Sequence, residues 1–181
     1  MEGKWTIRDY TYVATFAVLS FISSMVFGIL AFLYYTPLFF IGDFAYSFPH
    51  ALLIVICYLL VCKFPVWTYV STVEGVIDCI VLGWSPIWLP LYVFQGLIPD
   101  LVLKFTGGYE NPKLRHSIAA ALIYGVIMVT VTWLTFLYVY KLYYPLWLIC
   151  GSVVSCLIWI TLGAITGHKL TPRVKEALKA R

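Results

Sequence analysis

The distribution of lysine and arginine between long apolar stretches constrains this chain more than any other feature of its sequence. Six apolar stretches alternate with short polar segments, and a membrane-spanning helix needs about 20 apolar residues, with a range of about 17–25. We predict spans over residues 10–33, 48–62, 66–83, 87–106, 117–140 and 145–167. The second and third of these lie near or below the lower end of the length range.

The basic residues fall almost entirely on one side when the segments outside these spans are assigned alternately to the two sides of a membrane. One side holds Lys4, Arg8, Lys63, Lys104, Lys113, Arg115, Lys169, Arg173, Lys175, Lys179 and Arg181. The other side holds only Lys141. Because cytoplasmic loops carry the excess of Lys and Arg, we expect both termini to be cytoplasmic. A different number of spans would scramble this asymmetry, so it also supports the count of six.

The composition indicates an integral membrane protein. Hydrophobic residues make up 62% of the chain and charged residues 11%, with a mean hydropathy of +0.93. A soluble domain is about 45–50% apolar and about 25% charged. We therefore expect one all-α, multi-pass domain over residues 1–181 in the cell (plasma) membrane. The net charge of +4 is explained by topology and by anionic lipid headgroups, and no basic aromatic patch of the kind that binds nucleic acid occurs.

A stripe of small residues runs along the first predicted span. Ser20, Ser24 and Gly28 are spaced four residues apart, which places them on one face of a helix. Such stripes allow helix backbones to approach closely in lipid. The stripe either packs against another span of the same chain or forms a docking face for a separate membrane protein. We predict that Ser20, Ser24 and Gly28 are docking residues.

The segment 34–49 is predicted to be an outer loop. It contains Pro37, Gly42, Asp43 and Pro49 among many aromatic residues. Its apolar character favours a lid folded back over the spans, and an aromatic belt at the headgroups is the alternative.

Two carboxylates inside the third predicted span are the strongest functional signal. Glu74 and Asp78 are four residues apart, with Ser71 one turn earlier on the same broad face. Acidic residues in spans are expensive and generally face a cavity or a partner. No Lys or Arg lies at a comparable depth to neutralise them. Asp100, in the next span, is expected to bond Ser or Thr hydroxyls of neighbouring helices.

The polar and aromatic residues around these acids suit an organic cation. Gln95 lies near the middle of the fourth span beside Gly96, which allows close helix approach, and Trp84 and Trp133 lie toward the outer side. Carboxylates supply charge pairing, and aromatic faces add cation–π energy of roughly 0.5–2 kcal/mol per contact. We predict a ligand site made of Glu74, Asp78, Gln95, Trp84 and Trp133.

Motifs for catalysis, nucleotide binding and metal binding are missing from the sequence. The chain has no HExxH, GxSxG or P-loop, and His50, His116 and His168 lie near different span ends. Free cysteine behaves as a small hydrophobe, so the cysteines are expected to be buried packing residues. They are Cys57, Cys62, Cys79, Cys150 and Cys156. We expect neither an enzyme nor a bound metal or cofactor.

The chain resembles the membrane-embedded substrate-binding (S) component of an energy-coupling factor (ECF) vitamin transporter in its size, six predicted spans and small-residue first span. The stretch Glu74-Gly75-Val76-Ile77-Asp78-Cys79-Ile80-Val81-Leu82-Gly83, then Phe94-Gln95-Gly96 and Asp100, is similar to the branch for thiamine and its hydroxymethylpyrimidine precursor. In that branch two acids at the spacing of Glu74 and Asp78 are followed by a Gln-Gly pair and a Glu, so this chain departs from the pattern by having Asp at 78 and 100.

The resemblance implies a division of labour. An S component captures the vitamin from outside, docks on a transmembrane T component through the small residues of its first helix, and releases the vitamin inside when two cytoplasmic ATPases drive it to topple. Two alternatives remain open: a stand-alone proton-coupled carrier, in which Glu74 and Asp78 are proton sites, and a membrane protein that does not transport.

Overall fold

The computed structural model describes residues 4–31, 39–83, 85–139, 141 and 143–179, and within these ranges the chain forms six α-helices and no strand. The helices are α1 (Ile7–Ala31), α2 (Phe39–Val61), α3 (Val66–Val81), α4 (Leu89–Phe105), α5 (Leu114–Tyr138) and α6 (Leu146–Lys179). A short 3-10 turn, η2 (Pro86–Trp88), precedes α4. The all-α prediction is confirmed.

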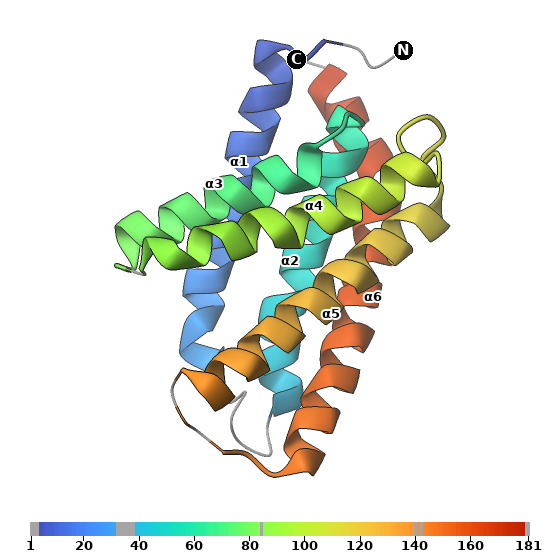
Figure 1. Ribbon diagram of the computed structural model, residues 1–181. Coiled ribbons are helices and arrows are strands. Elements are labelled where there is room, and N and C mark those ends of the chain that lie inside the picture. The colour runs from blue at the N-terminus through green and yellow to red at the C-terminus, as the bar shows by residue number, and fades with distance from the viewer. Residues whose placement is uncertain (1–3, 32–38, 84, 140, 142, 180–181) are drawn as a thin grey trace.

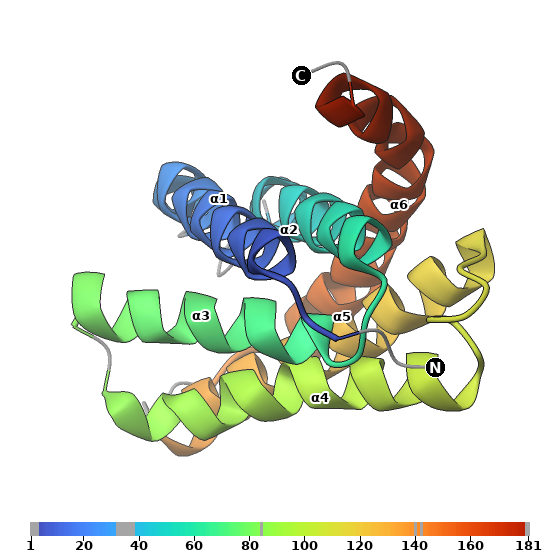
Figure 2. The ribbon, with the colours of Figure 1, turned by 90° about the horizontal axis from the view of Figure 1, so that it is seen from above.

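The helices are arranged in two sets. In Figure 1, α1, α2 and α6 run roughly side by side, whereas α3 and α4 form an antiparallel hairpin that crosses in front of them. The helix α5 runs obliquely beneath this hairpin, and the view from above in Figure 2 shows the hairpin along one side of the α1–α2 pair. The marked N and C ends of the chain lie at the same end of the molecule (Figure 1).

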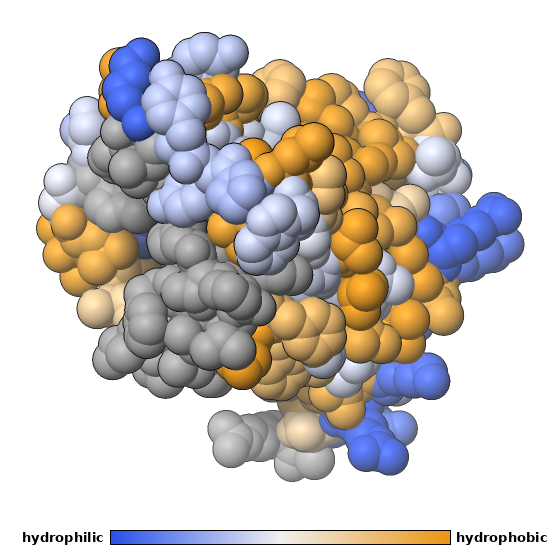
Figure 3. Space-filling view, turned by 90° about the horizontal axis from the view of Figure 1, so that it is seen from below, coloured by the Kyte–Doolittle hydropathy of each residue, from blue (hydrophilic) through white to orange (hydrophobic). Residues whose placement is uncertain are grey.

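Four helices of the described chain are long and apolar enough to cross a membrane. They cover Phe40–Val61, Pro86–Phe105, Leu114–Thr135 and Leu146–Lys179. The helix α3 is only 16 residues long and carries Glu74 and Asp78. At the end of the molecule shown in Figure 3, apolar residues cover much of the visible surface and hydrophilic residues lie toward its edges. The structure thus indicates a membrane protein, and six spans remain a prediction.

The helix α1 begins with a reciprocal cap. The Thr6 amide donates to Asp9 Oδ2 at 2.7 Å, and the Asp9 amide donates to Thr6 Oγ1 at 3.4 Å. This is the capping-box arrangement, with Asp in place of the usual Glu. Lys63 Nζ lies 2.6 Å from Asp9 Oδ2, so the same carboxylate fixes the start of α1 to the α2–α3 turn.

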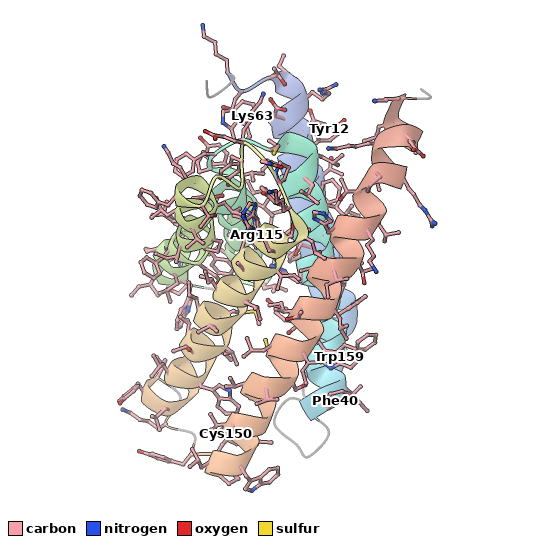
Figure 4. All side chains as sticks on the ribbon, turned by 90° about the vertical axis from the view of Figure 1, so that its right-hand side faces the viewer. Tyr12, Phe40, Lys63, Arg115, Cys150 and Trp159 are labelled. Carbon is pink, nitrogen blue, oxygen red and sulfur yellow. The ribbon has the colours of Figure 1, made fainter. Side chains whose placement is uncertain are left out.

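The expectation of a loop over residues 34–49 is wrong for its second part, while residues 34–38 lie outside the described residues. The helix α2 begins at Phe39 and continues through Pro49. The aromatic side chains belong to a helix surface: Phe40 and Phe44 pack on Trp159 of α6, with ring centroids 5.0 and 4.6 Å away. Figure 4 shows Phe40 and Trp159 together near the end of α2. Membrane helices tolerate proline because neighbouring groups satisfy the freed backbone carbonyl.

Two glycines of α6 set the closest approach between α2 and α6. A Cβ atom on Gly163 would lie 2.4 Å from the Phe48 carbonyl oxygen, and one on Gly167 would lie 2.7 Å from that of Leu52. Both distances are too short for a real side chain. A small-xxx-small pair therefore forms an internal interface on the last helix, in addition to the stripe noted on the first predicted span.

Two further glycines bring α3 and α4 into contact. A Cβ on Gly75 would lie 2.6 Å from the Tyr92 ring, and one on Gly96 would lie 2.6 Å from the Trp67 carbonyl oxygen. The predicted role of Gly96 in close helix approach is confirmed. This tight hairpin holds the acidic face of α3 in a fixed position.

Candidate functional site

The two acids of α3 lie on its inward face. Glu74 is 2% exposed and Asp78 is 8% exposed, and Ser71, one turn earlier, is also buried. The i, i+4 spacing therefore does place both carboxylates inside the bundle. Their neighbours come from α1, α2, α4 and α5.

Glu74 belongs to a three-residue cluster with Ser20 of α1 and His50 of α2. Ser20 Oγ lies 2.7 Å from His50 Nδ1 and donates to Glu74 Oε1 at 3.1 Å. His50 Nδ1 and Glu74 Oε1 are 3.5 Å apart. All three side chains are buried, so the cluster is shielded from solvent.

When an ionised Glu74 accepts from Ser20, this geometry is consistent with one tautomer of His50. A serine hydroxyl has one hydrogen, and that of Ser20 is directed to Glu74. The Ser20 oxygen can then only accept from His50, so Nδ1 carries a hydrogen. In the neutral imidazole, Nε2 is consequently an acceptor.

One polar atom of His50 and one of Glu74 have no partner. His50 Nε2 and Glu74 Oε2 are fully buried and form no hydrogen bond with any of the described residues. An unsatisfied buried polar group costs about 1–3 kcal/mol, and more when it is charged. Two such atoms on neighbouring side chains therefore lack a partner that the described residues could supply.

Asp78 forms a hydrogen bond with a residue of α4, the other helix of the hairpin. The Tyr92 hydroxyl of α4 donates to Asp78 Oδ2 at 2.5 Å. The Tyr92 ring also packs on Gly75, so this hydrogen bond depends on the absence of a side chain there. Asp78 and Glu74 thus share one face but have different partners.

Aromatic rings surround the cluster. Tyr46 and Tyr124 stack on the His50 ring, with centroid distances of 5.9 and 5.0 Å. The ring centroids of Trp67 and Tyr124 are 5.7 Å apart. The Trp67 indole Nε1 is another buried polar atom without a partner among the described residues. The cluster therefore combines acidic groups with aromatic rings.

Within the described part of the chain, no Lys or Arg neutralises Glu74 or Asp78. The ion pairs there are those of His50 with Glu74 and of Lys63 with Asp9. In Figure 4, Lys63 lies at the end of the molecule where α2 meets α3. If both carboxyl groups are ionised, the buried site keeps a net negative charge even when His50 is protonated.

Asp100 has a structural role. It is fully buried and accepts from the amides of Trp67 and Thr68, at 3.1 and 2.8 Å, and from Thr68 Oγ1 at 2.6 Å. The Tyr109 hydroxyl also donates to it. Pro65, at the N-cap position of α3, provides no side-chain cap, and Asp100 of α4 caps this helix instead. The expected bond to a threonine hydroxyl is confirmed.

Trp133 lies away from the cluster. The half-buried Gln95 follows Tyr92 on α4, and its ligand role stays a prediction. Trp133 lies nine residues beyond Tyr124 on α5, about 13.5 Å along the helix axis at 1.5 Å per residue. Its indole donates to Ser152 Oγ at 2.9 Å, and its ring packs on Tyr144. Trp84, also predicted for the site, lies outside the described residues.

The prediction that Ser20 belongs to an external docking face is wrong. Ser20 is 1% exposed, and Val13, Ala17 and Phe21 of the same helix face are also buried. This face packs on α2 and α3, where the polar partners of Ser20 lie. The side chains of Ser24 and Gly28 lie outside the described set, so their docking role stays a prediction.

Sequence reasoning missed His50 because it placed the start of the second span too late. A span starting at residue 48 leaves His50 at the outer surface, whereas α2 starts at Phe39 and carries His50 eleven residues into the helix. The continuous aromatic content of residues 39–49 was the signal that this helix begins earlier.

The five cysteines are free thiols. Among the described residues, no group of three His, Cys, Asp or Glu side chains is arranged to hold a metal ion. Cys57 and Cys156 are buried as predicted, Cys62 and Cys79 are half-buried, and Cys150 is exposed at the end of α6 (Figure 4), contrary to prediction.

Comparison of the chain with protein-family models, curated proteins and solved structures found no match.

Proposed function

We propose that this chain is the substrate-capture subunit of an ECF-type importer in the plasma membrane, with thiamine or its hydroxymethylpyrimidine precursor as the favoured ligand. The observation that carries the proposal is the buried, acidic Glu74–Asp78 face with unpaired polar atoms and no Lys or Arg partner among the described residues. Burying carboxylates within a membrane costs free energy, and acidic residues at such positions generally have a function.

The surroundings of the acids support a nitrogen-containing aromatic or cationic ligand. Glu74 has a free carboxylate oxygen, Asp78 lies one turn away, and Tyr46, Tyr124 and Trp67 provide rings nearby. Charge pairing and ring contacts together discriminate against anions. A vitamin with a cationic ring and an amino group fits these features.

The proposal includes six spans, cytoplasmic termini, a T component and a pair of ATPases as partners. Ser24 and Gly28 are the proposed docking residues on α1, without Ser20. Ser24→Leu or Gly28→Leu should abolish uptake while the isolated protein still binds its ligand. Loss of ligand binding in both variants would assign the stripe to internal packing.

Binding of thiamine tests the proposal. We expect thiamine or hydroxymethylpyrimidine to quench the tryptophan fluorescence of the purified protein at micromolar concentration. Glu74→Gln should weaken binding by at least about tenfold, which corresponds to about 1.4 kcal/mol. Glu110→Gln, which changes an exposed acid, is the matched control. No quenching by either compound, or tight binding of riboflavin instead, would remove this substrate.

A stand-alone proton-coupled carrier is the second candidate, and the His50–Glu74 contact favours it. Chains of His, Glu and Asp inside membranes act as proton relays in pumps and transporters. Uptake by a carrier of this kind persists without ATPases and collapses when the proton gradient is removed. Uptake by the proposed importer subunit requires the ATPases.

A further inference from the structure

The unpaired atoms of His50 and Glu74 define which hydrogen bonds a ligand must make. Glu74 Oε2 is a carboxylate oxygen and only accepts. His50 Nε2 accepts in the neutral tautomer whose Nδ1–H donates to Ser20, which is the tautomer consistent with donation from Ser20 to Glu74. Both atoms are buried and lie on side chains that are themselves only 3.5 Å apart.

Two neighbouring acceptors in an acidic site call for a ligand with several donors and a positive charge. A primary ammonium or an amidinium carries at least two N–H groups on one cationic centre. A quaternary ammonium carries the same charge but no N–H group, so it would leave both acceptors unsatisfied. Each of these two atoms would then be a buried polar group without a partner, which weakens binding of the quaternary ion.

The rings stacked on His50 cover its faces, so a ligand would have to contact the edge of the ring. Tyr46 and Tyr124 stack on the ring, with interplanar angles of 14° and 21°. The ring position is fixed further by the Ser20 contact at Nδ1. Nε2 is therefore the atom of His50 through which a ligand can be bound.

We propose that His50 is a ligand-binding and specificity-determining residue, which with Glu74 selects ligands that present at least two N–H donors on one nitrogen-bearing group, such as an aminopyrimidine or a primary ammonium, over ligands whose only nitrogen is quaternary. The proposal rests on the function proposed above, since it takes the Glu74 face to be the capture site. It adds a residue from α2 and a rule for the chemical class of the ligand.

Benzylammonium and benzyltrimethylammonium are the probes, because they share a ring and a charge and differ in N–H donors. We expect the purified protein to bind benzylammonium at least about tenfold more tightly by calorimetry. His50→Phe, which keeps a ring between the tyrosines, should abolish this preference, and His50→Gln should restore part of it through the amide oxygen. His116→Phe, which changes a buried histidine at the start of α5, should leave the preference intact.

A measurement on the unaltered chain keeps the test decisive if the His50 variants fail to fold. In protein labelled with ¹⁵N-histidine, benzylammonium should shift the Nε2 resonance of His50, and benzyltrimethylammonium should not. His116→Asn and His168→Asn variants assign that resonance by elimination.

The other outcomes contradict either the role of His50 alone or the proposed function as well. Equal binding of the two probes, or a preference that survives in His50→Phe, overturns the inference and leaves the cation-capture function standing. Binding of neither probe, with benzyl alcohol bound instead, overturns both.

Discussion

Asp100→Ala should destabilise the protein strongly because Asp100 caps α3 from a different helix. The substitution removes the acceptor for two buried amides, the Thr68 hydroxyl and the Tyr109 hydroxyl. A lost cap costs about 0.5–2 kcal/mol, and each buried donor left unpaired costs about 1–3 kcal/mol. Water and local relaxation will satisfy some of these donors, so we expect a loss of about 3 kcal/mol.

The buried cysteines offer a direct assay of this loss. Cys57 and Cys156 are fully buried, so in a background with Cys62, Cys79 and Cys150 replaced by serine a thiol-reactive dye reports their exposure on thermal unfolding in detergent. For a chain of this size 1 kcal/mol corresponds to about 2–4 °C, so Asp100→Ala should lower Tm by about 6–12 °C. Asp100→Asn keeps one acceptor oxygen and should lose less. Glu110→Ala, on the loop after α4, should leave Tm unchanged.

A Tm for Asp100→Ala within about 2 °C of the unaltered protein would refute the capping role. If the same variant then lost ligand binding, Asp100 would belong to the binding site instead. An intact Tm together with intact binding would mean that another group caps α3.

Three further predictions concern the chain away from the site. Burial raises the pKa of Asp9, but hydrogen bonds from Lys63 and Thr6 outweigh this effect and lower the pKa below its usual value. The stabilisation is therefore complete above the pKa of the unfolded chain, about 3.9, and is lost as the pH falls through the lowered pKa of the folded protein. Asp9→Asn should flatten the acid side of a Tm–pH profile. A Tm–pH profile unchanged by that substitution would show that the Lys63–Asp9 ion pair does not stabilise the fold. Gly163→Leu should prevent α2–α6 packing and folded expression, unlike Val154→Leu on the exposed face, and normal melting of the glycine variant would argue against the close contact. A reporter fused after Arg181 should be active only in the cytoplasm, and activity outside would reverse the topology.

The helix content and most helix positions followed from the sequence because hydropathy sets them directly. The predicted span 66–83 and the helix Val66–Val81 agree closely, since Pro65 precedes the helix and Gly83 follows it. The start of α2 could not be placed, because Pro49 and Gly42 read as loop residues although tertiary contacts with α6 keep the segment helical.

The site was predicted in part. The spacing of Glu74 and Asp78 was enough to place both on one buried face. The partners of Glu74 were not predictable, because Ser20 and His50 lie far away in the sequence and meet only through helix packing. Local patterns carry no information about such contacts. The same reason explains why Ser20 was assigned to an outer face and Trp133 to the ligand site.

Identification of the small molecules that co-purify with the protein tests the central claim most directly. Native mass spectrometry of the detergent-solubilised protein, followed by fragmentation of released ligands, should reveal a protonated or aromatic nitrogen base of vitamin size. The same species should be lost from Glu74→Gln and retained by Glu110→Gln. A neutral or anionic ligand retained equally by both variants would contradict the assignment of Glu74 and Asp78 to a cation-capture site.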